Sequence, residues 1–305
     1  MICLEHIYDL IILGAGPGGL SSAIYAQRAM LDFVILEKWL PGGEIANTFE
    51  VENYLGLNKL SGMELADKMV KHVEDLGVKI TIDPVVSVDF SQKIKKVVAE
   101  NNTYYAKTII IATGASARKL GVKGENRLNG LGVSYCATCD GFLYKNKITA
   151  VVGGGDVAVE DAIYLSRVCE KVYLIHRRDN LRAVKALQDR LFKIKNVEII
   201  WDSTVEEISG ENFVERITVK NKKTLEYTNI DVNGLFVAVG NSPNIEYLNN
   251  QVEQIDGFWI KTNSRLETNI EGVFAVGDVR DTYLRQVVSS VSDGALAVNS
   301  LAKYL

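Results

Sequence analysis

The stretch Tyr8-Asp-Leu-Ile-Ile-Leu13, followed directly by Gly14-Ala-Gly16-Pro-Gly-Gly19, decides the fold of this 305-residue chain. The apolar run predicts a buried strand, and residues 20–29 predict a helix after the glycines. A strand, a Gly-x-Gly-x-x-Gly turn and a helix are typical of a dinucleotide-binding βαβ unit. The glycines permit a tight turn and close backbone approach, while the helix N-terminus offers unpaired N–H groups to a pyrophosphate.

A second apolar run, Phe33-Val-Ile-Leu36, completes this unit and ends at Glu37. An acidic residue at this distance from the glycines accepts hydrogen bonds from the ribose hydroxyls of a bound nucleotide. A carboxylate also repels a 2′-phosphate, so the first unit suits the adenosine of FAD. The residues assigned to FAD binding on this basis are Gly14, Gly16, Gly19 and Glu37.

The same pattern occurs a second time in the chain. Ile148-Thr-Ala-Val-Val152 leads into Gly153-Gly-Gly155-Asp-Val-Ala158, which precedes a predicted helix to about residue 167 and a strand over residues 172–175. One such glycine motif is weak evidence, because glycines also cluster in ordinary turns. Two of them, each between a strand and a helix, predict two nucleotide sites, as in enzymes that use a flavin and a nicotinamide.

Basic residues follow the second strand of the second unit. The sequence His176-Arg177-Arg178 stands where the first unit has its acidic residue, and Arg182 lies four residues further on. Guanidinium groups clamp a phosphate with charge-assisted, often bidentate hydrogen bonds, so this cluster predicts NADPH in preference to NADH. A solvated basic turn is the alternative. The residues assigned to NADPH binding are Gly153, Gly155, Ala158, His176, Arg177, Arg178 and Arg182.

Both halves of the chain close on a buried apolar strand that ends at glycine. These strands are expected over residues 108–114 and 234–240, and a third stretch, Gly272-Val-Phe-Ala-Val-Gly277-Asp278, returns the chain to the first unit. The prediction is an α/β fold with two Rossmann-like, three-layer ββα dinucleotide-binding domains, the second inserted into the first. Residues 1–116 and 247–305 would form the FAD-binding domain, and residues 117–246 the NADPH-binding domain.

The sequence Cys136-Ala-Thr-Cys139-Asp140 lies shortly before the second glycine motif. Cysteines at this spacing can close a small disulfide ring, and such pairs often have a lowered thiol pKa. The alternatives are half a zinc site or two unrelated buried thiols, although no second Cys or His pair accompanies this one. With two nucleotide sites in the same chain, the pair predicts redox activity, and Asp140 could handle protons beside it.

Composition and charge exclude several other classes of protein. The net charge of -4 gives no basic excess for nucleic acid, and no apolar run approaches the ~20 residues that span a bilayer. Acidic Glu5 and Asp9 stand where a signal peptide has its basic region, so we expect a cytoplasmic protein. Four cysteines are too few for a secreted disulfide scaffold; Cys3 and Cys169 are interpreted as incidental thiols, and no metal site is expected.

These residues together closely resemble the low-molecular-weight bacterial thioredoxin reductases over nearly the whole chain. The position of the Cys-x-x-Cys pair is specific, since larger pyridine-nucleotide disulfide reductases carry it after the first glycine motif instead. The matching motifs are Gly14-Ala-Gly-Pro-Gly, Glu50-Val-Glu-Asn53-Tyr, Ala112-Thr-Gly-Ala-Ser-Ala117, Cys136-Ala-Thr-Cys-Asp-Gly141, Gly153-Gly-Gly, His176-Arg-Arg-Asp, Gly277-Asp278 and Arg285-Gln286.

The resemblance implies roles for individual residues. Cys139 would face the flavin, Cys136 would attack the disulfide of thioredoxin or a thioredoxin-like protein, and Asp140 would be the acid/base. The family forms homodimers and rotates its inserted domain on two linkers, here near residues 115–120 and 242–247. The further FAD contacts that the resemblance implies are Asn53, Asp278, Arg285, Gln286 and Val287.

Four positions depart from the family pattern. Leu131 replaces a common arginine and Leu143 a second aromatic residue, at two positions that help to dock thioredoxin in the family. Glu44 replaces a glutamine beside the flavin, and Ser292 replaces a glycine. The first two departures bear on partner recognition, and the other two on flavin packing or potential.

Other functions would keep part of this pattern. A ferredoxin-linked thioredoxin reductase or a disulfide-forming oxidase would keep the flavin and the cysteines, but such relatives tend to lose the NADPH motif. A ferredoxin–NADP reductase would lack the cysteines, and a non-catalytic flavoprotein would not need them. The arginine cluster and the cysteine pair together favour an NADPH-dependent disulfide reductase.

Overall fold

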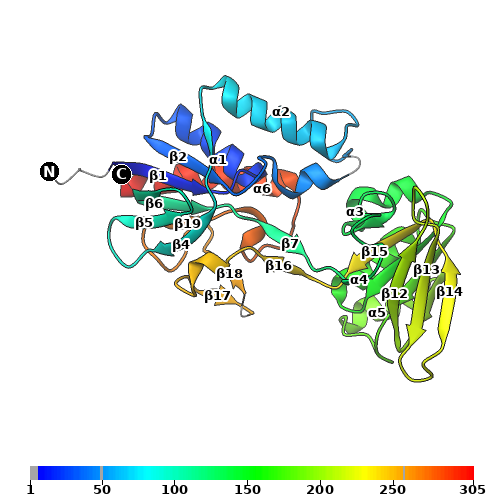
Figure 1. The fold of residues 1–305 in the computed structure, drawn as a ribbon. Coiled ribbons are helices and arrows are strands. Elements are labelled where there is room, and N and C mark those ends of the chain that lie inside the picture. The colour runs from blue at the N-terminus through cyan, green and yellow to red at the C-terminus, as the bar shows by residue number, and fades with distance from the viewer. Residues whose placement is uncertain (1–5, 49–50, 257) are drawn as a thin grey trace. The chain divides into compact units, whose positions relative to one another are not determined.

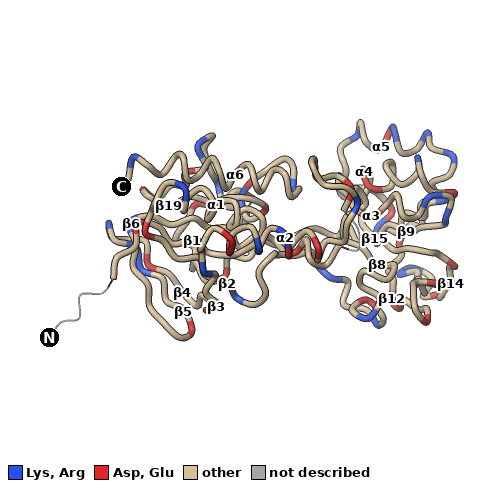
Figure 2. Tube along the Cα trace, turned by 90° about the horizontal axis from the view of Figure 1, so that it is seen from above, with Lys and Arg blue, Asp and Glu red and all other residues tan. Residues whose placement is uncertain are grey.

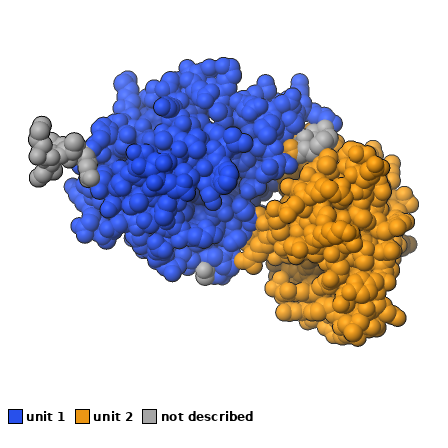
Figure 3. All heavy atoms as spheres, in the orientation of Figure 1, with its two compact units in different colours: residues 1–47, 54–116, 242–305 blue, residues 48–53, 117–241 orange. Residues whose placement is uncertain are grey.

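The computed structural model describes residues 6–48, 51–256 and 258–305, so Cys3, Glu5 and Glu50 lie outside the described residues. The chain forms two compact units, which Figure 3 shows in different colours. The first unit comprises the described residues of Met1–Asn47, Tyr54–Ser116 and Ser242–Leu305. The second unit comprises the described residues of Thr48–Asn53 together with Ala117–Asn241.

A largely parallel sheet forms the centre of the first unit. Its strands follow the order β3-β2-β1-β6-β5-β4, and β19 pairs with β6. Strand β1 runs parallel to β2 and β6, whereas β4, β5 and β6 form an antiparallel meander. The strands are β1 Ile7–Leu13, β2 Phe33–Glu37, β3 Ile80–Ile82, β4 Val85–Asp89, β5 Lys95–Ala99, β6 Thr103–Ile111 and β19 Val273–Ala275.

Successive side chains of β1 enter two different cores. Leu10 and Ile12 pack with residues of the helices, while Ile11 and Leu13 pack with residues of the meander. Because both faces of the strand are buried over its last four residues, the sequence there, Leu10-Ile-Ile-Leu13, is a continuous apolar run rather than an alternating one. Figure 1 shows the three helices of this unit together on one side of the sheet. They are α1 Pro17–Arg28, α2 Gly62–Asp75 and α6 Val287–Leu301.

Helix α1 begins at Pro17, three residues before the predicted start. The ring of proline fixes φ near the helical value, and its missing N–H costs nothing in the first turn. Helices α1 and α6 then pack closely through glycines. A Cβ atom at Gly294 would collide with the carbonyl oxygen of Gly18, and one at Gly18 would lie 3.3 Å from the carbonyl oxygen of Ser290.

The sequence Ser61-Gly-Met-Glu64 has the pattern of a capping box, and the structure forms this box at the start of α2. The backbone N–H of Glu64 donates to the Ser61 hydroxyl at 3.1 Å, and the backbone N–H of Ser61 donates to the Glu64 carboxylate at 2.7 Å. Gly77, with φ of +80°, follows the last turn and ends the helix.

The second unit repeats this architecture with its own sheet, in the order β11-β10-β9-β15-β8, and an antiparallel layer, β12-β13-β14. Strand β9 runs parallel to β10 and β15 and leads through the second glycine motif into α4. The elements are β8 Val133–Ser134, α3 Ala137–Asp140, β9 Ile148–Gly153, α4 Asp156–Leu165, β10 Lys171–Ile175, α5 Lys185–Leu191, β11 Val197–Ile200, β12 Ser203–Ser209, β13 Arg216–Asn221, β14 Tyr227–Asp231 and β15 Gly234–Ala238.

Two short strands, β7 Ala115–Ala117 and β16 Asn241–Pro243, pair with each other where the chain leaves and re-enters the first unit. A further pair, β17 Gln254–Ile255 and β18 Trp259–Ile260, lies in the first unit. The predicted α/β fold with two Rossmann-like ββα sheets is confirmed, because each unit combines a parallel sheet, an antiparallel layer and helices. None of the helices in the described part of the chain combines the length and the apolar character that crossing a bilayer requires.

Candidate active site

The first glycine motif forms a compact turn between β1 and α1. Gly14 has φ of +101°, and a Cβ atom there would lie 2.5 Å from the carbonyl oxygen of Ala112. A Cβ atom at Gly19 would collide with the carbonyl oxygen of Gly14. Gly16 is the N-cap of α1, and the nearest atom to a Cβ there is 3.7 Å away, on Gly43. The turn therefore keeps its backbone uncovered where a pyrophosphate would approach the helix N-terminus.

Glu37 lies beside this turn, at the end of β2. Its carboxylate accepts hydrogen bonds from the backbone N–H groups of Ala15 and Lys38, both at 2.7 Å, and of Trp39 at 3.1 Å. The three donors hold the carboxylate in one orientation next to the glycines. A carboxylate has two lone pairs on each oxygen, so ribose hydroxyls can still bond to it.

The start of α6 lies near the start of α1. Gln286 is the N-cap of α6 and Val287 is its first residue, and the contact of Gly18 with Ser290 joins the first turns of the two helices. Asp278 lies in the short 3-10 helix Gly277–Val279 and accepts a hydrogen bond from the Ser290 hydroxyl at 3.5 Å. Burial raises the pKa of Asp278 to about 6, against the lowering effect of the nearby Arg285 charge.

Arg285 stacks on Trp259 with its guanidinium carbon 3.9 Å from the ring centroid. Burial lowers the pKa of Arg285, and its Nε atom has no hydrogen-bond partner among the residues that the structure describes. Both the glycine cradle and this buried donor fit FAD, which carries a pyrophosphate and several oxygen acceptors. The predicted contact Asn53 is different, because it is exposed and groups with the second unit.

The second glycine motif repeats the geometry of the first. Gly153 has φ of +158°, and a Cβ atom there would lie 2.6 Å from Cβ of Ala158 and would collide with the carbonyl oxygen of Ala238. Gly155 is the N-cap of α4, and no described atom outside its chain neighbours comes within 4 Å of a Cβ built on it. This open helix start suits the pyrophosphate of a second dinucleotide.

His176 is buried against the backbone of the second glycine turn and does not belong to the exposed basic cluster. The residue is only 4% exposed, and a Cβ atom on Gly154 would collide with its ring. Its Nε2 atom lies 3.0 Å from the carbonyl oxygen of Asn180, and burial lowers the pKa of the imidazole. The buried His176 ring therefore shapes the loop that carries the arginines.

Arg177, Arg178 and Arg182 are exposed around this loop. The backbone N–H of Arg182 donates to the carbonyl oxygen of Gly154 at 2.7 Å, which ties the basic loop to the glycine turn. Basic residues continue along α5, as Figure 2 shows. Three exposed guanidiniums next to an open helix start fit the 2′-phosphate of NADPH.

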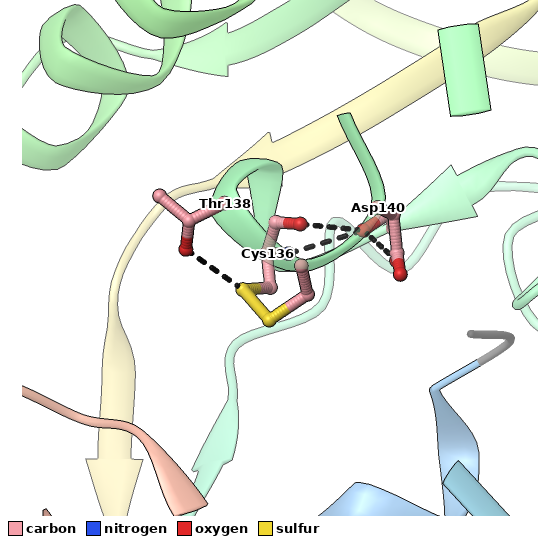
Figure 4. The surroundings of a disulfide bond; sticks show 5 residues. Cys136, Thr138 and Asp140 are labelled. Atoms are coloured by element: carbon pink, nitrogen blue, oxygen red, sulfur yellow. Dashed lines mark hydrogen bonds between the residues drawn. A yellow bond between two sulfur atoms is a disulfide. The ribbon is translucent and has the colours of Figure 1, made fainter. Parts of the chain in front are cut away.

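The predicted cysteine pair forms a disulfide, with its Cα atoms 5.3 Å apart (Figure 4). Cys136 is the N-cap of the short helix α3, and its carbonyl oxygen accepts hydrogen bonds from the backbone N–H groups of Cys139 at 3.3 Å and Asp140 at 3.1 Å. The Cys136 sulfur lies 3.4 Å from the Thr138 hydroxyl. The zinc alternative loses support, because no group of three metal-ligating side chains occurs within the described residues.

Asp140 is held next to the disulfide by Ser134, a residue that the sequence did not single out. The Ser134 hydroxyl donates to the Asp140 carboxylate at 2.6 Å and accepts a hydrogen bond from the backbone N–H of Cys136 at 3.1 Å. Burial, together with the charge of Asp140, raises the pKa of Tyr144 to about 12. Nothing in the sequence around Ser134 signals this role, since a serine two residues before a cysteine is common.

The remaining cysteine and the departures from the family pattern have ordinary surroundings. Cys169 is a buried thiol whose pKa is raised by burial. Leu131 and Ser292 are exposed, and Leu143 is half-buried. The Glu44 carboxylate accepts hydrogen bonds from the Ser116 hydroxyl and the Asn47 amide, both at 3.2 Å.

Two dinucleotide turns and a disulfide next to a carboxylate define an oxidoreductase that exchanges electrons among a nicotinamide, a flavin and a disulfide. A family model described as pyridine nucleotide-disulphide oxidoreductase matches residues 8–294, and the chain belongs to this family. The predicted cofactors, FAD and NADPH, and the disulfide-reductase chemistry are thereby confirmed.

The relatives confirm the resemblance seen in the sequence. The chain is 45% identical over 305 residues to a protein named thioredoxin reductase from Listeria monocytogenes, covering 99% of this chain and 95% of that one. It is 42% identical over 302 residues to the thioredoxin reductase of Bacillus subtilis, with coverage of 99% and 96%. The solved structure of thioredoxin reductase from Streptococcus pyogenes has a TM-score of 0.92 and 43% identity, and the match covers 98% of both chains.

Proposed function

We propose that this protein passes electrons from NADPH, through FAD and the Cys136–Cys139 disulfide, to the disulfide of thioredoxin or a thioredoxin-like protein. The observation that carries the proposal is the disulfide itself, which lies in the same unit as the second glycine motif and beside Asp140. The names of the relatives in Listeria and Bacillus support thioredoxin as the partner.

The two nucleotides would bind to different domains. Residues 1–116 and 247–305 would hold FAD. The contacts proposed there are the first glycine turn, Glu37, Asn53, Asp278, Arg285 and the start of α6. Residues 117–246 would hold NADPH through the second turn and the exposed arginines. Rotation on the linkers near residues 115–120 and 242–247 would bring first the nicotinamide and then the Cys136–Cys139 disulfide to the flavin.

When bound, FAD takes up two electrons from NADPH and delivers them to a disulfide. Two electrons and two protons open the Cys136–Cys139 bond to a pair of thiols. Cys136, as thiolate, then attacks one sulfur of the partner disulfide, which forms a mixed disulfide and releases the other partner sulfur. Cys139 attacks Cys136 in turn, so that the reduced partner leaves and the original disulfide is restored.

Asp140 would carry the proton that this exchange requires. Asp140 is the last residue of α3, which contains Cys139 and is capped by Cys136, and the Ser134 hydroxyl donates to the Asp140 carboxylate at 2.6 Å. It would accept a proton when a thiolate forms and return the proton to the departing partner sulfur. Ser134 acts here as a positioning residue.

The proposal extends to the setting of the enzyme. We place it in the cytoplasm as a homodimer, with thioredoxin as its macromolecular substrate and without a nucleic-acid or membrane partner. The cysteine usage and the net charge of -4 support this setting.

Anaerobic reduction of the purified protein tests the proposal. NADPH should bleach the bound flavin at much lower concentration than NADH, and added thioredoxin should restore the colour. A Cys136→Ser variant should still be bleached but should reduce no thioredoxin, whereas Cys169→Ser, the control, should behave as the parent. A flavin that NADPH does not bleach contradicts the electron donor. Bleaching without reoxidation by any thioredoxin contradicts the partner alone.

A further inference from the structure

The stack of Arg285 on Trp259 is a contact that the proposed function does not use. The guanidinium carbon lies 3.9 Å from the centroid of the indole ring, well within the range of a cation–π interaction. Trp259 is half-buried on β18, and Arg285 is half-buried immediately before the start of α6. The two residues are 26 positions apart in sequence, so only the fold brings them together.

The strand that carries Trp259 is fixed on both sides. Trp259 pairs with Ile255 of β17, and its neighbour Ile260 is fully buried. The carbonyl oxygen of Ile260 accepts a hydrogen bond of 2.9 Å from the backbone N–H of Asp281, which belongs to the segment that leads to Arg285. The indole ring therefore has a defined position relative to that segment.

The segment that carries Arg285 is also anchored at both ends. At its start, Arg280 forms a two-pronged ion pair with Asp293, at 2.8 and 3.0 Å. At its end, the Ser289 hydroxyl donates to the carbonyl oxygen of Leu284 at 2.9 Å. The stack thus joins two rigid parts of the first unit.

The guanidinium of Arg285 keeps an unused donor. Its Nε atom is buried and has no hydrogen-bond partner in the described part of the chain, although the charge of Asp278 acts on the group. Leaving a buried N–H of a charged group without an acceptor is costly, so such a donor indicates an acceptor supplied by a ligand.

An aromatic ring beside Arg285 leaves the Nε–H donor available, whereas a carboxylate would accept a hydrogen bond from it. All five N–H bonds of a guanidinium lie in its plane, and a carboxylate binds them there. An indole face attracts the cation from above the plane and takes none of these donors. Stacking on the indole therefore fixes the plane of the Arg285 guanidinium and leaves the N–H donors at its edge available to a ligand.

We propose that Trp259 is a positioning residue for FAD binding, which stacks on Arg285 so that the buried Nε–H is presented to an oxygen acceptor of FAD. The inference rests on the proposed function, because it takes the first unit as the FAD domain and Arg285 as one of its contacts.

Titration of the apoprotein with FAD, followed by flavin fluorescence, tests the inference without an activity assay. Trp259→Ala should raise the Kd of FAD by about 3- to 30-fold, the range expected for a cation–π contact that is lost. Trp259→Phe, which retains an aromatic face, should restore most of the affinity. Tyr283→Ala, which removes a fully exposed ring in the same segment, serves as the matched control and should leave the Kd unchanged.

A double-mutant cycle with Arg285→Ala separates positioning from general packing. If Trp259 acts through Arg285, Trp259→Ala should change the Kd of FAD less than twofold once Arg285 is absent. An unchanged Kd in Trp259→Ala, or an equal loss with and without Arg285, would overturn the inference. The KM for NADPH should stay at the parent value in every variant.

The same titration distinguishes this inference from the proposed function. A parent protein that binds FAD and is reduced by NADPH, while Trp259→Ala binds FAD equally well, refutes the role of Trp259 alone. A parent apoprotein that does not bind FAD refutes the proposed function and the inference together.

Discussion

Asp161 on α4 is a half-buried residue whose carboxyl pKa rises to about 7, mainly because desolvation disfavours its charged form and also because of the charge on Glu160. A folded-state pKa above the unfolded value means that the native state holds the proton more tightly. The contribution of Asp161 to stability is therefore complete below about pH 4 and is lost as the pH rises through about 7.

Asp161→Asn should accordingly stabilise the protein at alkaline pH. We expect it to raise the free energy of unfolding by on the order of 2 kcal/mol at pH 8 and by much less at pH 5, because an amide carries no charge to bury. Thermal unfolding at the two pH values measures the difference. Glu211→Gln, at an exposed carboxyl, is the control and should show no such pH dependence. A gain that is equal at both pH values contradicts the assignment of the buried charge.

The exposed arginines carry the prediction for coenzyme choice. The double variant Arg177→Ala/Arg178→Ala should raise the KM for NADPH at least about tenfold and leave the KM for NADH nearly unchanged, because only the 2′-phosphate loses its charged partners. Steady-state kinetics with both coenzymes measures this. Arg190→Ala, which removes a basic residue of α5, should change neither value. Equal losses for both coenzymes would contradict a phosphate-specific role.

At the scale of single residues, the sequence indicated the residues that carry the chemistry but not the residues that position them. Cys136, Cys139 and Arg182 were recognisable because their residue types and spacing carry chemistry. Ser134 and Trp259 were not, since a hydroxyl or an indole acquires its role only from the neighbour that the fold provides. The position of His176 beneath Gly154, rather than among the arginines, likewise required the packing of the second unit.

Among the elements, α2 offers a direct test of local sequence signals. Ser61→Ala removes the acceptor of the Glu64 backbone N–H, so the free energy of unfolding should fall by about 1 kcal/mol. Chemical denaturation gives the value. Glu74→Ala, on the exposed side of the other end of α2, should cost less than half as much. A larger loss in the control would contradict the importance of the cap.

Long or strongly patterned elements were predictable, and short ones were not. Strands β1 and β9 are mostly apolar and each leads into a glycine motif, and α2 carries its cap and its terminal glycine. Helix α3 has four residues, too few for any periodic pattern, yet it contains Cys139 and has Cys136 as its N-cap. Strands β17 and β18 have two residues each and are recognisable only from their pairing.

For the whole molecule, the presence of one glycine turn in each unit predicts that the two nucleotide sites can be lost separately. Gly19→Val places a side chain against the carbonyl oxygen of Gly14 and should abolish FAD binding, while NADP⁺ affinity stays within about threefold of the parent. Gly153→Val should have the opposite effect. Flavin content and calorimetric NADP⁺ binding measure the two losses. Loss of both ligands in either variant would contradict independent sites.

The sequence by itself determined the class of fold, the two dinucleotide turns, the preference for a 2′-phosphate and the redox cysteine pair. Each of these features depends on residues that are close together in the chain. Backbone sterics and local charge are therefore enough to determine it. Only the tertiary structure decided which side chains hold those groups in place. Ser134 against Asp140 and Trp259 against Arg285 are such contacts. Trp259 meets Arg285 because packing joins segments that are 26 positions apart, whereas Ser134 meets Asp140 because the chain turns between them over six residues. The local sequence carries little trace of either pair.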